Sequence, residues 1–122
     1  MSVVPDTYRR TPKYGLAYSA LIMAAHSRSM LTYTGIARLA GLAQAGNPMA
    51  TQVGRLVGEI SEDEVTQGRP MLSALVVEKD TGQPGEGFFK LARDLKIFDR
   101  TSKSAKRKFL SKEKSKLFTV WA

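Results

Sequence analysis

Apolar side chains recur every three or four residues in the first part of the chain, which is the spacing of an amphipathic helix. Thr11 followed by Pro12 is a typical helix start, with threonine as the N-cap and proline in the first turn, and it predicts a helix over residues 12–28. Thr32 or Thr34 is placed to cap a second, short helix, which Gly41 ends.

A third helix is predicted over residues 48–60, because Asn47-Pro48 repeats the cap-and-proline signal. Its apolar face is formed by residues at helical spacing, namely Met49, Val53, Leu56, Val57 and Ile60. Gly54 and Gly58 lie inside this helix, and each weakens it by about 1 kcal/mol relative to alanine. Glycines in such places usually allow another group to approach the helix closely.

The pattern changes at Pro70 from helical spacing to strand and turn chemistry. Residues 71–77, MLSALVV, are a short apolar run that predicts a strand, and residues 78–85 are rich in turn formers, which predicts a loop. Helical spacing resumes over residues 87–98, where Phe88 and Phe89 are adjacent, so only one of them is expected to face the core. Residues 101–122 are interpreted either as an amphipathic helix or as a tail that orders only on a partner.

Two helices joined by a glycine-containing turn, then a strand and a glycine-rich loop, are the elements of a winged helix. The expected fold class is mixed α/β (α+β), mainly helical, with a winged helix-turn-helix over residues 14–100. Residues 1–13 are expected to form a basic N-terminal arm, and residues 101–122 a lysine-rich C-terminal helix or tail. The helix from Pro48 would be the recognition helix, and residues 78–85 the wing. The outward side of this helix is expected to show Thr51, Gln52, Arg55 and Glu59.

Positive charge is concentrated at the end of the 122-residue chain, whose net charge is +8. The net charge is +4 over residues 1–60, −2 over residues 61–100 and +6 over residues 101–122. A strongly basic segment beside a mildly acidic one is typical of a protein that binds a polyanion, because each lysine or arginine near a phosphate releases counterions. We therefore expect a nucleic-acid partner, with double-stranded DNA favoured over RNA.

The candidate contacts come from the helix-turn-helix and from the tail. They are Tyr33, Thr51, Gln52 and Arg55, followed by Lys103, Lys106, Arg107, Lys108 and Lys112. The tail cations supply charge without a geometry for reading bases, as expected for contacts that position a protein on phosphates. Arg9, Arg10 and Lys13 form a smaller basic group at the start of the chain.

Several classes of protein are disfavoured by composition. The chain has no cysteine, which removes disulfide scaffolds, thiolate nucleophiles and cysteine-based metal sites, and His26 is its only histidine. No apolar run approaches the roughly 20 residues that cross a bilayer, and the first residues lack the order of a signal peptide. We expect a cytoplasmic bacterial protein with no metal, no cofactor and no membrane contact, associated with the nucleoid if it binds DNA.

Three segments together resemble the DNA-binding domain of the O6-alkylguanine-DNA alkyltransferases and the alkyltransferase-like proteins. They are LTYTGIARLAG (31–41), GNPMATQVGRLVGEI (46–60) and RPMLSALVVEKDTGQPG (69–85), and the resemblance covers about residues 14–87. It implies that Tyr33 presses on a phosphate of a flipped nucleotide. It also implies that Arg55, in Arg55-Leu56-Val57-Gly58, enters the base stack as the flipped base leaves.

The chain departs from that family at the residues that perform its chemistry. Where the family has Pro-Cys-His-Arg, this sequence has Pro70-Met71-Leu72-Ser73. Alkyl transfer needs a thiolate and a base that activates it, and both are missing. The expected protein is therefore a binding module and not an enzyme.

Two other classes of function remain open. A protein-protein module, such as a phage or bacterial inhibitor, would place its basic face or its C-terminal tail on an acidic protein surface. A metal-dependent nuclease would use Glu62, Asp63 and Glu64 as magnesium ligands. The same segment is also typical of a helix start, with Ser61 as cap and Glu64 closing a capping box.

Overall fold

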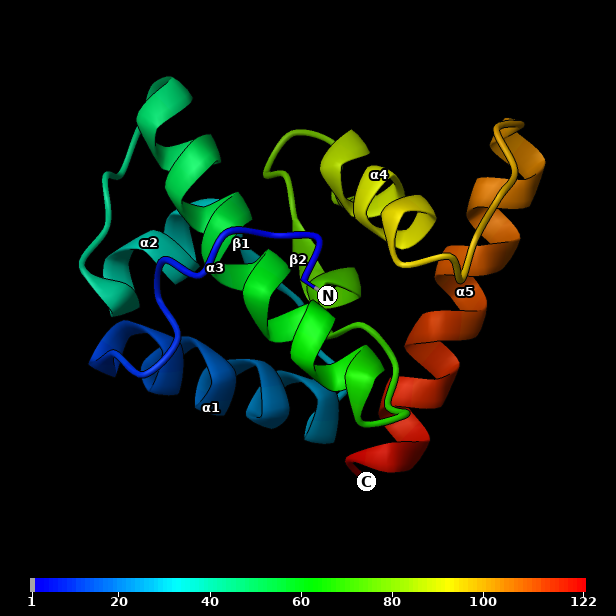
Figure 1. Ribbon diagram of the computed structural model, residues 1–122, viewed down its shortest axis with the longest axis horizontal. Coiled ribbons are helices and arrows are strands. Elements are labelled where there is room, and N and C mark those ends of the chain that lie inside the picture. Colours follow the sequence, from blue (N-terminus) through cyan, green and yellow to red (C-terminus); the bar gives the residue numbers. More distant parts are fainter. Residues whose placement is uncertain (1) are drawn as a thin grey trace.

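The computed structural model describes residues 2–122, and over this range the fold is mainly helical. Five α-helices, one 3₁₀ helix and two short strands follow one another along the described residues (Figure 1). Their bounds are α1 (Pro12–His26), β1 (Leu31–Thr32), α2 (Tyr33–Ala40), α3 (Gly46–Thr66), η1 (Leu72–Leu75), β2 (Val76–Val77), α4 (Glu86–Asp94) and α5 (Lys103–Val120). The expectation of a mainly helical fold is thus confirmed, and the two strands form a small parallel sheet.

Helices α1 and α2 begin where their capping residues predict. Helix α1 follows Thr11 and ends at His26, two residues before the predicted end. The side chain of Thr32 accepts a hydrogen bond from the Gly35 N–H at 3.0 Å, so Thr32 is the cap of α2. Gly41 ends α2 in the left-handed region, with φ of 71°, a conformation that glycine adopts at little cost.

Helix α3 is longer than predicted at both ends. It begins at Gly46 after Ala45, so Asn47 is not its N-cap, and it runs on to Thr66. Ser61 starts no new helix, because it lies within α3. Its side chain is buried and hydrogen-bonded to Ser73. The prediction ended at Ile60 because the next residues are acidic, and in the structure most of these acids face other parts of the chain instead of water.

The predicted strand over residues 71–77 is largely wrong. Residues 72–75 form the 3₁₀ helix η1, and only Val76 and Val77 are a strand. All of residues 71–77 are buried, and an apolar run of this length fits any buried element. Strand β2 pairs in parallel with β1, and the chain then continues through residues 78–85 into α4, so a winged helix is not confirmed.

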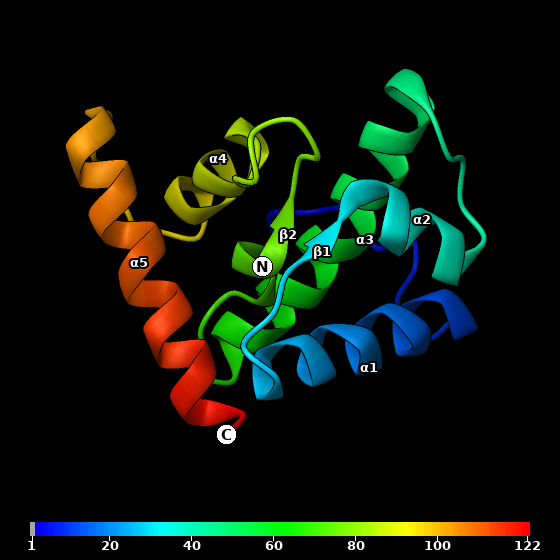
Figure 2. The same cartoon turned by 180° about the vertical axis from the view of Figure 1, so that it is seen from behind.

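Helices α4 and α5 complete the core on one side of α3. Figures 1 and 2 show α4 between α3 and α5, with α1 running along the lower side of the molecule. Phe88 and Phe89 are both buried, because Phe109 of α5 covers the first ring and Phe98 covers the second, at centroid distances of 5.9 and 6.0 Å. The expectation that only one of the two lies inside was wrong, since the segment after α4 wraps around its second face.

The C-terminal segment is a continuous helix and not a loose tail. Ser102 caps α5 by accepting a hydrogen bond from the Ala105 N–H at 3.1 Å, and α5 buries Leu110, Glu113 and Leu117. The carboxylate of Glu113 accepts a hydrogen bond from the Met71 N–H at 2.9 Å. Helix α5 is therefore fastened to the chain just before η1 by both apolar contact and a buried hydrogen bond.

Candidate nucleic-acid interface

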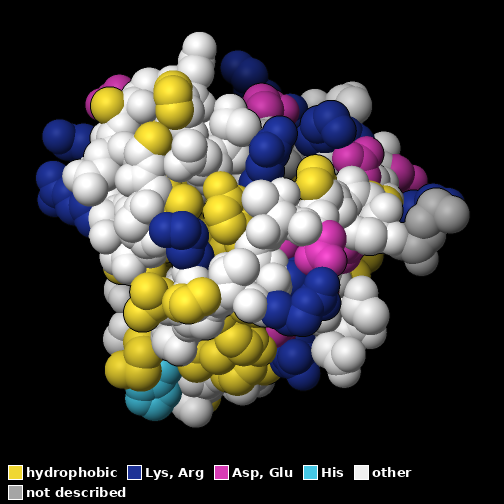
Figure 3. All heavy atoms as spheres, turned by 60° about the vertical axis from the view of Figure 1, so that its left-hand side comes forward, with side chains coloured by type: hydrophobic (Ala, Val, Ile, Leu, Met, Phe, Trp, Pro, Cys, Tyr) yellow, Lys and Arg dark blue, Asp and Glu magenta, His cyan; other side chains and the backbone are white. Residues whose placement is uncertain are grey.

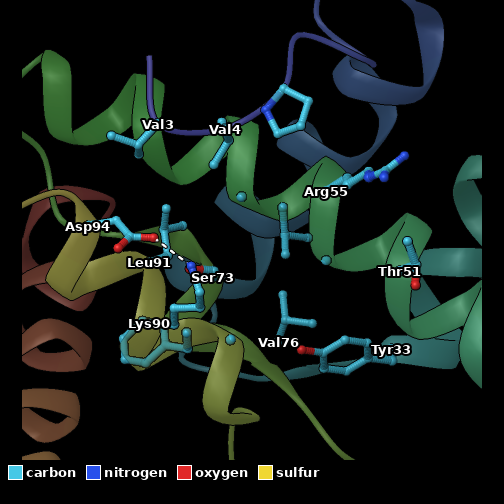
Figure 4. A pocket seen from close by; sticks show the side chains of 16 residues that line it. Val3, Val4, Tyr33, Thr51, Arg55, Ser73, Val76, Lys90, Leu91 and Asp94 are labelled. Atoms are coloured by element: carbon cyan, nitrogen blue, oxygen red, sulfur yellow. Dashed lines mark hydrogen bonds and ion pairs between the residues drawn. The ribbon is translucent and has the colours of Figure 1, made fainter. Parts of the chain in front are cut away.

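A cleft of about 730 Å³ lies between α3, α4, β2 and the N-terminal segment (Figure 4). Its wall is mostly apolar and is formed by Val3, Val4, Pro5, Val57, Val76, Phe88 and Leu91. Three glycines, Gly54, Gly58 and Gly87, also line it, and its polar residues are Tyr33, Thr51, Arg55, Ser73, Lys90 and Asp94. Gly54 and Gly58, the two glycines of α3, thus border an open space.

Three of the candidate contacts meet on one side of this cleft. The pairing of Leu31 with Val76 places Tyr33 beside the end of β2, and α3 contributes Thr51 and, one turn later, Arg55. Thr51 and Arg55 are exposed, and within residues 2–122 the Arg55 guanidinium makes neither an ion pair nor a hydrogen bond. Figure 4 shows the Arg55 side chain leaving the rim and pointing away from the cleft. Its charge is therefore available to a ligand outside the protein.

Tyr33 is half-buried, and its hydroxyl points into the cleft (Figure 4). Burial raises the pKa of the Tyr33 phenol, and the nearby Glu78 carboxylate acts in the same direction. The phenol therefore stays protonated at neutral pH and can donate a hydrogen bond. The Tyr33 side chain also packs against the core.

Gln52 holds the turn between α2 and α3. Its side-chain oxygen accepts a hydrogen bond from the Ala43 N–H at 2.9 Å. The turn is also held at the end of α2, where the Lys13 ammonium donates to the carbonyl oxygens of Ala40 and Gly41 at 2.9 and 3.1 Å. Gln52 and Lys13 thus serve the packing of the helix pair, and only the amide nitrogen of Gln52 remains for a ligand.

The tail cations form a second, separate surface. Lys103, Arg107, Lys108 and Lys112 are exposed and have no ion pair in the described part of the chain. Lys106 differs, because it pairs with Glu86 at 3.1 Å and lies over the Phe89 ring, 5.5 Å from its centroid. Since α4 lies between α3 and α5, the structure does not bring these cations together with Arg55 (Figures 1 and 2).

Arg9 and Arg10 of the N-terminal segment form ion pairs with acidic side chains of the protein itself. Arg9 donates to Glu62 at 2.7 Å and to both oxygens of Asp63 at 3.0 and 3.1 Å. The hydrogen bond to Asp63 is the main cause that raises the pKa of Arg9, so the guanidinium stays charged. Arg10, which is exposed, pairs with Asp6 at 2.9 Å.

The carboxylates that a nuclease would need are occupied by the chain's own donors. Glu62 accepts hydrogen bonds from the Ser2 hydroxyl and the Val3 N–H, both at 2.6 Å, and Glu64 pairs with Arg69. Burial acts to raise the pKa of Glu62, but its hydrogen bonds outweigh burial, so the pKa is lowered. Among residues 2–122, no three acidic or histidine side chains are grouped to hold a metal ion.

The expectation that Glu59 lies on the outward side of the recognition helix is wrong, because Glu59 is buried and anchors the N-terminal segment. Its carboxylate is fully buried and accepts hydrogen bonds from the backbone N–H groups of Thr7, Tyr8 and Arg9 at 2.9 to 3.1 Å. The available signal was its place next to the apolar face of α3, between Val57 and Ile60, where an unpaired carboxylate would be unfavourable. Its partners were not readable, because they are backbone groups about fifty residues away.

An apolar patch lies away from the cleft, on the outer side of α1. Leu16 is 52% exposed and Met23 is 63% exposed, and they lie two turns apart on this helix. Figure 3 shows hydrophobic side chains gathered beside His26, the only histidine. Within residues 2–122, no helix combines the length and apolar character needed to cross a bilayer.

The comparisons with known proteins leave the family of this chain open. No protein-family model, no curated protein and no solved structure matches it. The resemblance to the alkyltransferase family therefore stays a prediction from the sequence segments themselves.

Proposed function

We propose that this protein binds double-stranded DNA without catalysing a reaction, through a helix-turn-helix formed by α2 and α3. Arg55 is the leading contact, with Thr51 and Tyr33 beside it. The observation that supports this most is the free guanidinium of Arg55 on the exposed side of α3, next to two further polar groups at one cleft. An arginine placed in this way contributes about 1–3 kcal/mol when it meets base edges.

Helix α5 has the supporting role of holding phosphates. Its exposed cations lie on a different surface from Arg55, so they attract the polyanion without reading bases. Each phosphate contact adds about 0.9 to the slope of log affinity against log salt. The affinity is therefore expected to fall steeply as salt rises.

No transfer chemistry is proposed. Met71 and Leu72 stand where the alkyltransferase motif has its cysteine and histidine, and both are fully buried in the core. The replaced motif thus serves packing and not reactivity. The resemblance still suggests that Tyr33 and Arg55 act beside a nucleotide turned out of the duplex, and the cleft next to them offers the space.

The test is duplex binding measured by fluorescence anisotropy over a salt series. Arg55→Ala should weaken binding about 10- to 100-fold. Arg28→Asn is the matched control, because it removes the same charge beyond the far end of α1, and asparagine tolerates the positive φ of 56° at that position. Equal losses in the two variants, or affinity that does not depend on salt, would contradict the proposal.

A protein partner is the second candidate, favoured by the exposed Leu16 and Met23. Exposed apolar side chains on one helix face are typical of protein contact sites, and they lie on a different helix from Arg55. This candidate predicts that a stoichiometric protein is retained from a nuclease-treated lysate, and that Met23→Lys abolishes its retention. DNA binding with no protein retained would rule out the protein partner and leave DNA binding as the function.

A further inference from the structure

The hydrogen bonds around Ser73, a residue of the cleft wall, leave its hydroxyl hydrogen without an acceptor within residues 2–122. Ser73 is 5% exposed and lines the cleft. Its N–H donates to the Ser61 hydroxyl oxygen at 2.9 Å, and the Ser61 hydroxyl donates in turn to the Ser73 hydroxyl oxygen at 2.7 Å. Because Ser61 is the donor in this pair, the Ser73 hydrogen has to point elsewhere. Within residues 2–122 it has no acceptor.

Tyr33 supplies a second hydroxyl with the same property. Its phenol stays neutral, points into the cleft and makes no hydrogen bond within residues 2–122. The Tyr33 oxygen lies 3.7 Å from the place where a Cβ on Gly85 would stand, so the loop passes close by without bonding it. The cleft therefore offers two hydroxyl donors from two different elements.

The rest of the lining is mostly apolar, and its other polar side chains are exposed ones. Lys90 and Asp94 are paired with each other at 2.9 Å, and Arg55 points outward. Thr51 adds an exposed hydroxyl, and the remaining side chains are aliphatic or aromatic. An ion would lose its hydration on entering without gaining an opposite charge, whereas an uncharged apolar group would lose little.

Glycine keeps this space open. A Cβ added to Gly54 or Gly87 would meet no atom within 4 Å, so open space lies beside both residues. At Gly58 a Cβ would lie 3.8 Å from Val4 and Leu91, which is ordinary contact. The volume of about 730 Å³ lies within the range of roughly 300–1,000 Å³ that small-molecule sites have.

We infer that the cleft is a binding site for an uncharged, largely apolar ring that presents a hydrogen-bond acceptor to the Ser73 hydroxyl. The apolar walls hold the ring, and Ser73, fixed by Ser61, selects the acceptor. Such a group can arrive as a free small molecule or as a ring carried by a duplex. The chemistry of the site is the same in both cases, and the binding of a free small molecule does not depend on the proposed DNA binding.

Quinoline and naphthalene are the probes, because they share a shape and only quinoline has a ring-nitrogen acceptor. Binding is followed by NMR shifts of the Val76 and Leu91 methyl groups. Gly87→Leu should weaken both probes at least tenfold by filling the cleft, whereas Gly15→Leu, equally free of contacts but on α1, should change neither. Ser73→Ala should weaken quinoline about fivefold, the effect of losing one hydrogen bond, and leave naphthalene unchanged.

Two results would overturn the inference. One is quinoline binding that Gly87→Leu does not weaken, which would place the probe elsewhere. The other is equal weakening of both probes by Ser73→Ala, which would show a packing effect and no reading of the acceptor. Since Ser73→Ala also leaves the Ser61 hydroxyl without its acceptor, a thermal melt checks the fold, and Gly87→Leu tests the site with both serines intact.

A duplex with one 2-aminopurine separates the two sources, because the fluorescence of this base rises when it leaves the stack. A rise with the native protein that Gly87→Leu abolishes assigns the site to a base, and quinoline binding without a rise assigns it to a free molecule. Either result supports the site. If Arg55→Ala leaves DNA binding unchanged while the probes still bind, the proposed function fails and the cleft site stands.

Discussion

The substitution Glu59→Gln tests how the N-terminal segment is held on α3. The carboxylate of Glu59 is fully buried and accepts hydrogen bonds from three consecutive backbone N–H groups, those of Thr7, Tyr8 and Arg9. Glutamine keeps one carbonyl oxygen but turns its NH₂ group toward donors. At least one of the three N–H groups then loses its acceptor, and all three lose a charged one.

The magnitude follows from the cost of those losses. A hydrogen bond to a charged group contributes about 1.5–3 kcal/mol, and an orphaned buried donor costs about 1–3 kcal/mol. The segment can move away from α3 and hydrate its N–H groups, which limits the total to roughly 3 kcal/mol. Because Val3, Val4 and Pro5 of this segment line the cleft, its release should also open the cleft.

Urea unfolding measures the loss, with Glu86→Gln as the control for an exposed glutamate whose side chain is 75% accessible. Hydrogen exchange at residues 7–9 should accelerate in Glu59→Gln before global unfolding, and the control should leave it unchanged. An unfolding free energy within about 0.5 kcal/mol of the native protein, the range of ordinary surface substitutions, would show that Glu59 does not anchor the segment.

Three further changes are expected to alter stability. Gly54→Ala should stabilise α3 by up to about 1 kcal/mol in a thermal melt, because its Cβ meets nothing within 4 Å and alanine favours the helix; destabilisation would contradict this. The interactions that lower the pKa of Glu62 stabilise the fold above about pH 4.5, and this stability is lost as pH falls toward the folded-state pKa. Glu62→Gln should therefore make the melting temperature depend less on pH in the acid range. Glu113→Ala should lower the unfolding free energy by about 1–3 kcal/mol, because it leaves the buried Met71 N–H without an acceptor, and calorimetry that shows no change would disprove this.

The sequence predicts most of the helices because their ends have local chemistry. Thr11-Pro12, Thr32 and Gly41 act through neighbouring backbone groups, so α1 and α2 could be placed to within two residues. Residues 71–77 show the opposite case. Burial on all sides removes the periodicity that separates a strand from a 3₁₀ helix, and the acceptor of the Met71 N–H is Glu113, which is 42 residues away.

The candidate site could be predicted only where one helix carries it. Thr51 and Arg55 are one turn apart on α3, so their common side follows from spacing alone. Tyr33, Ser73 and Leu91 reach the same cleft through β1–β2 pairing and α4 packing, which no local pattern specifies. The separation of the α5 cations from Arg55 could not be predicted either, because the net charge of a segment does not determine where its helix packs.

The Arg55 side of α3 is the surface proposed to meet DNA. The most direct test is to record amide NMR shifts of the whole chain while a short duplex is added. The largest shifts are expected at Thr51, Gly54 and Arg55, with smaller ones along α5 and none on the outer side of α1. Shifts confined to α5 or to α1, with α3 unchanged, would contradict it.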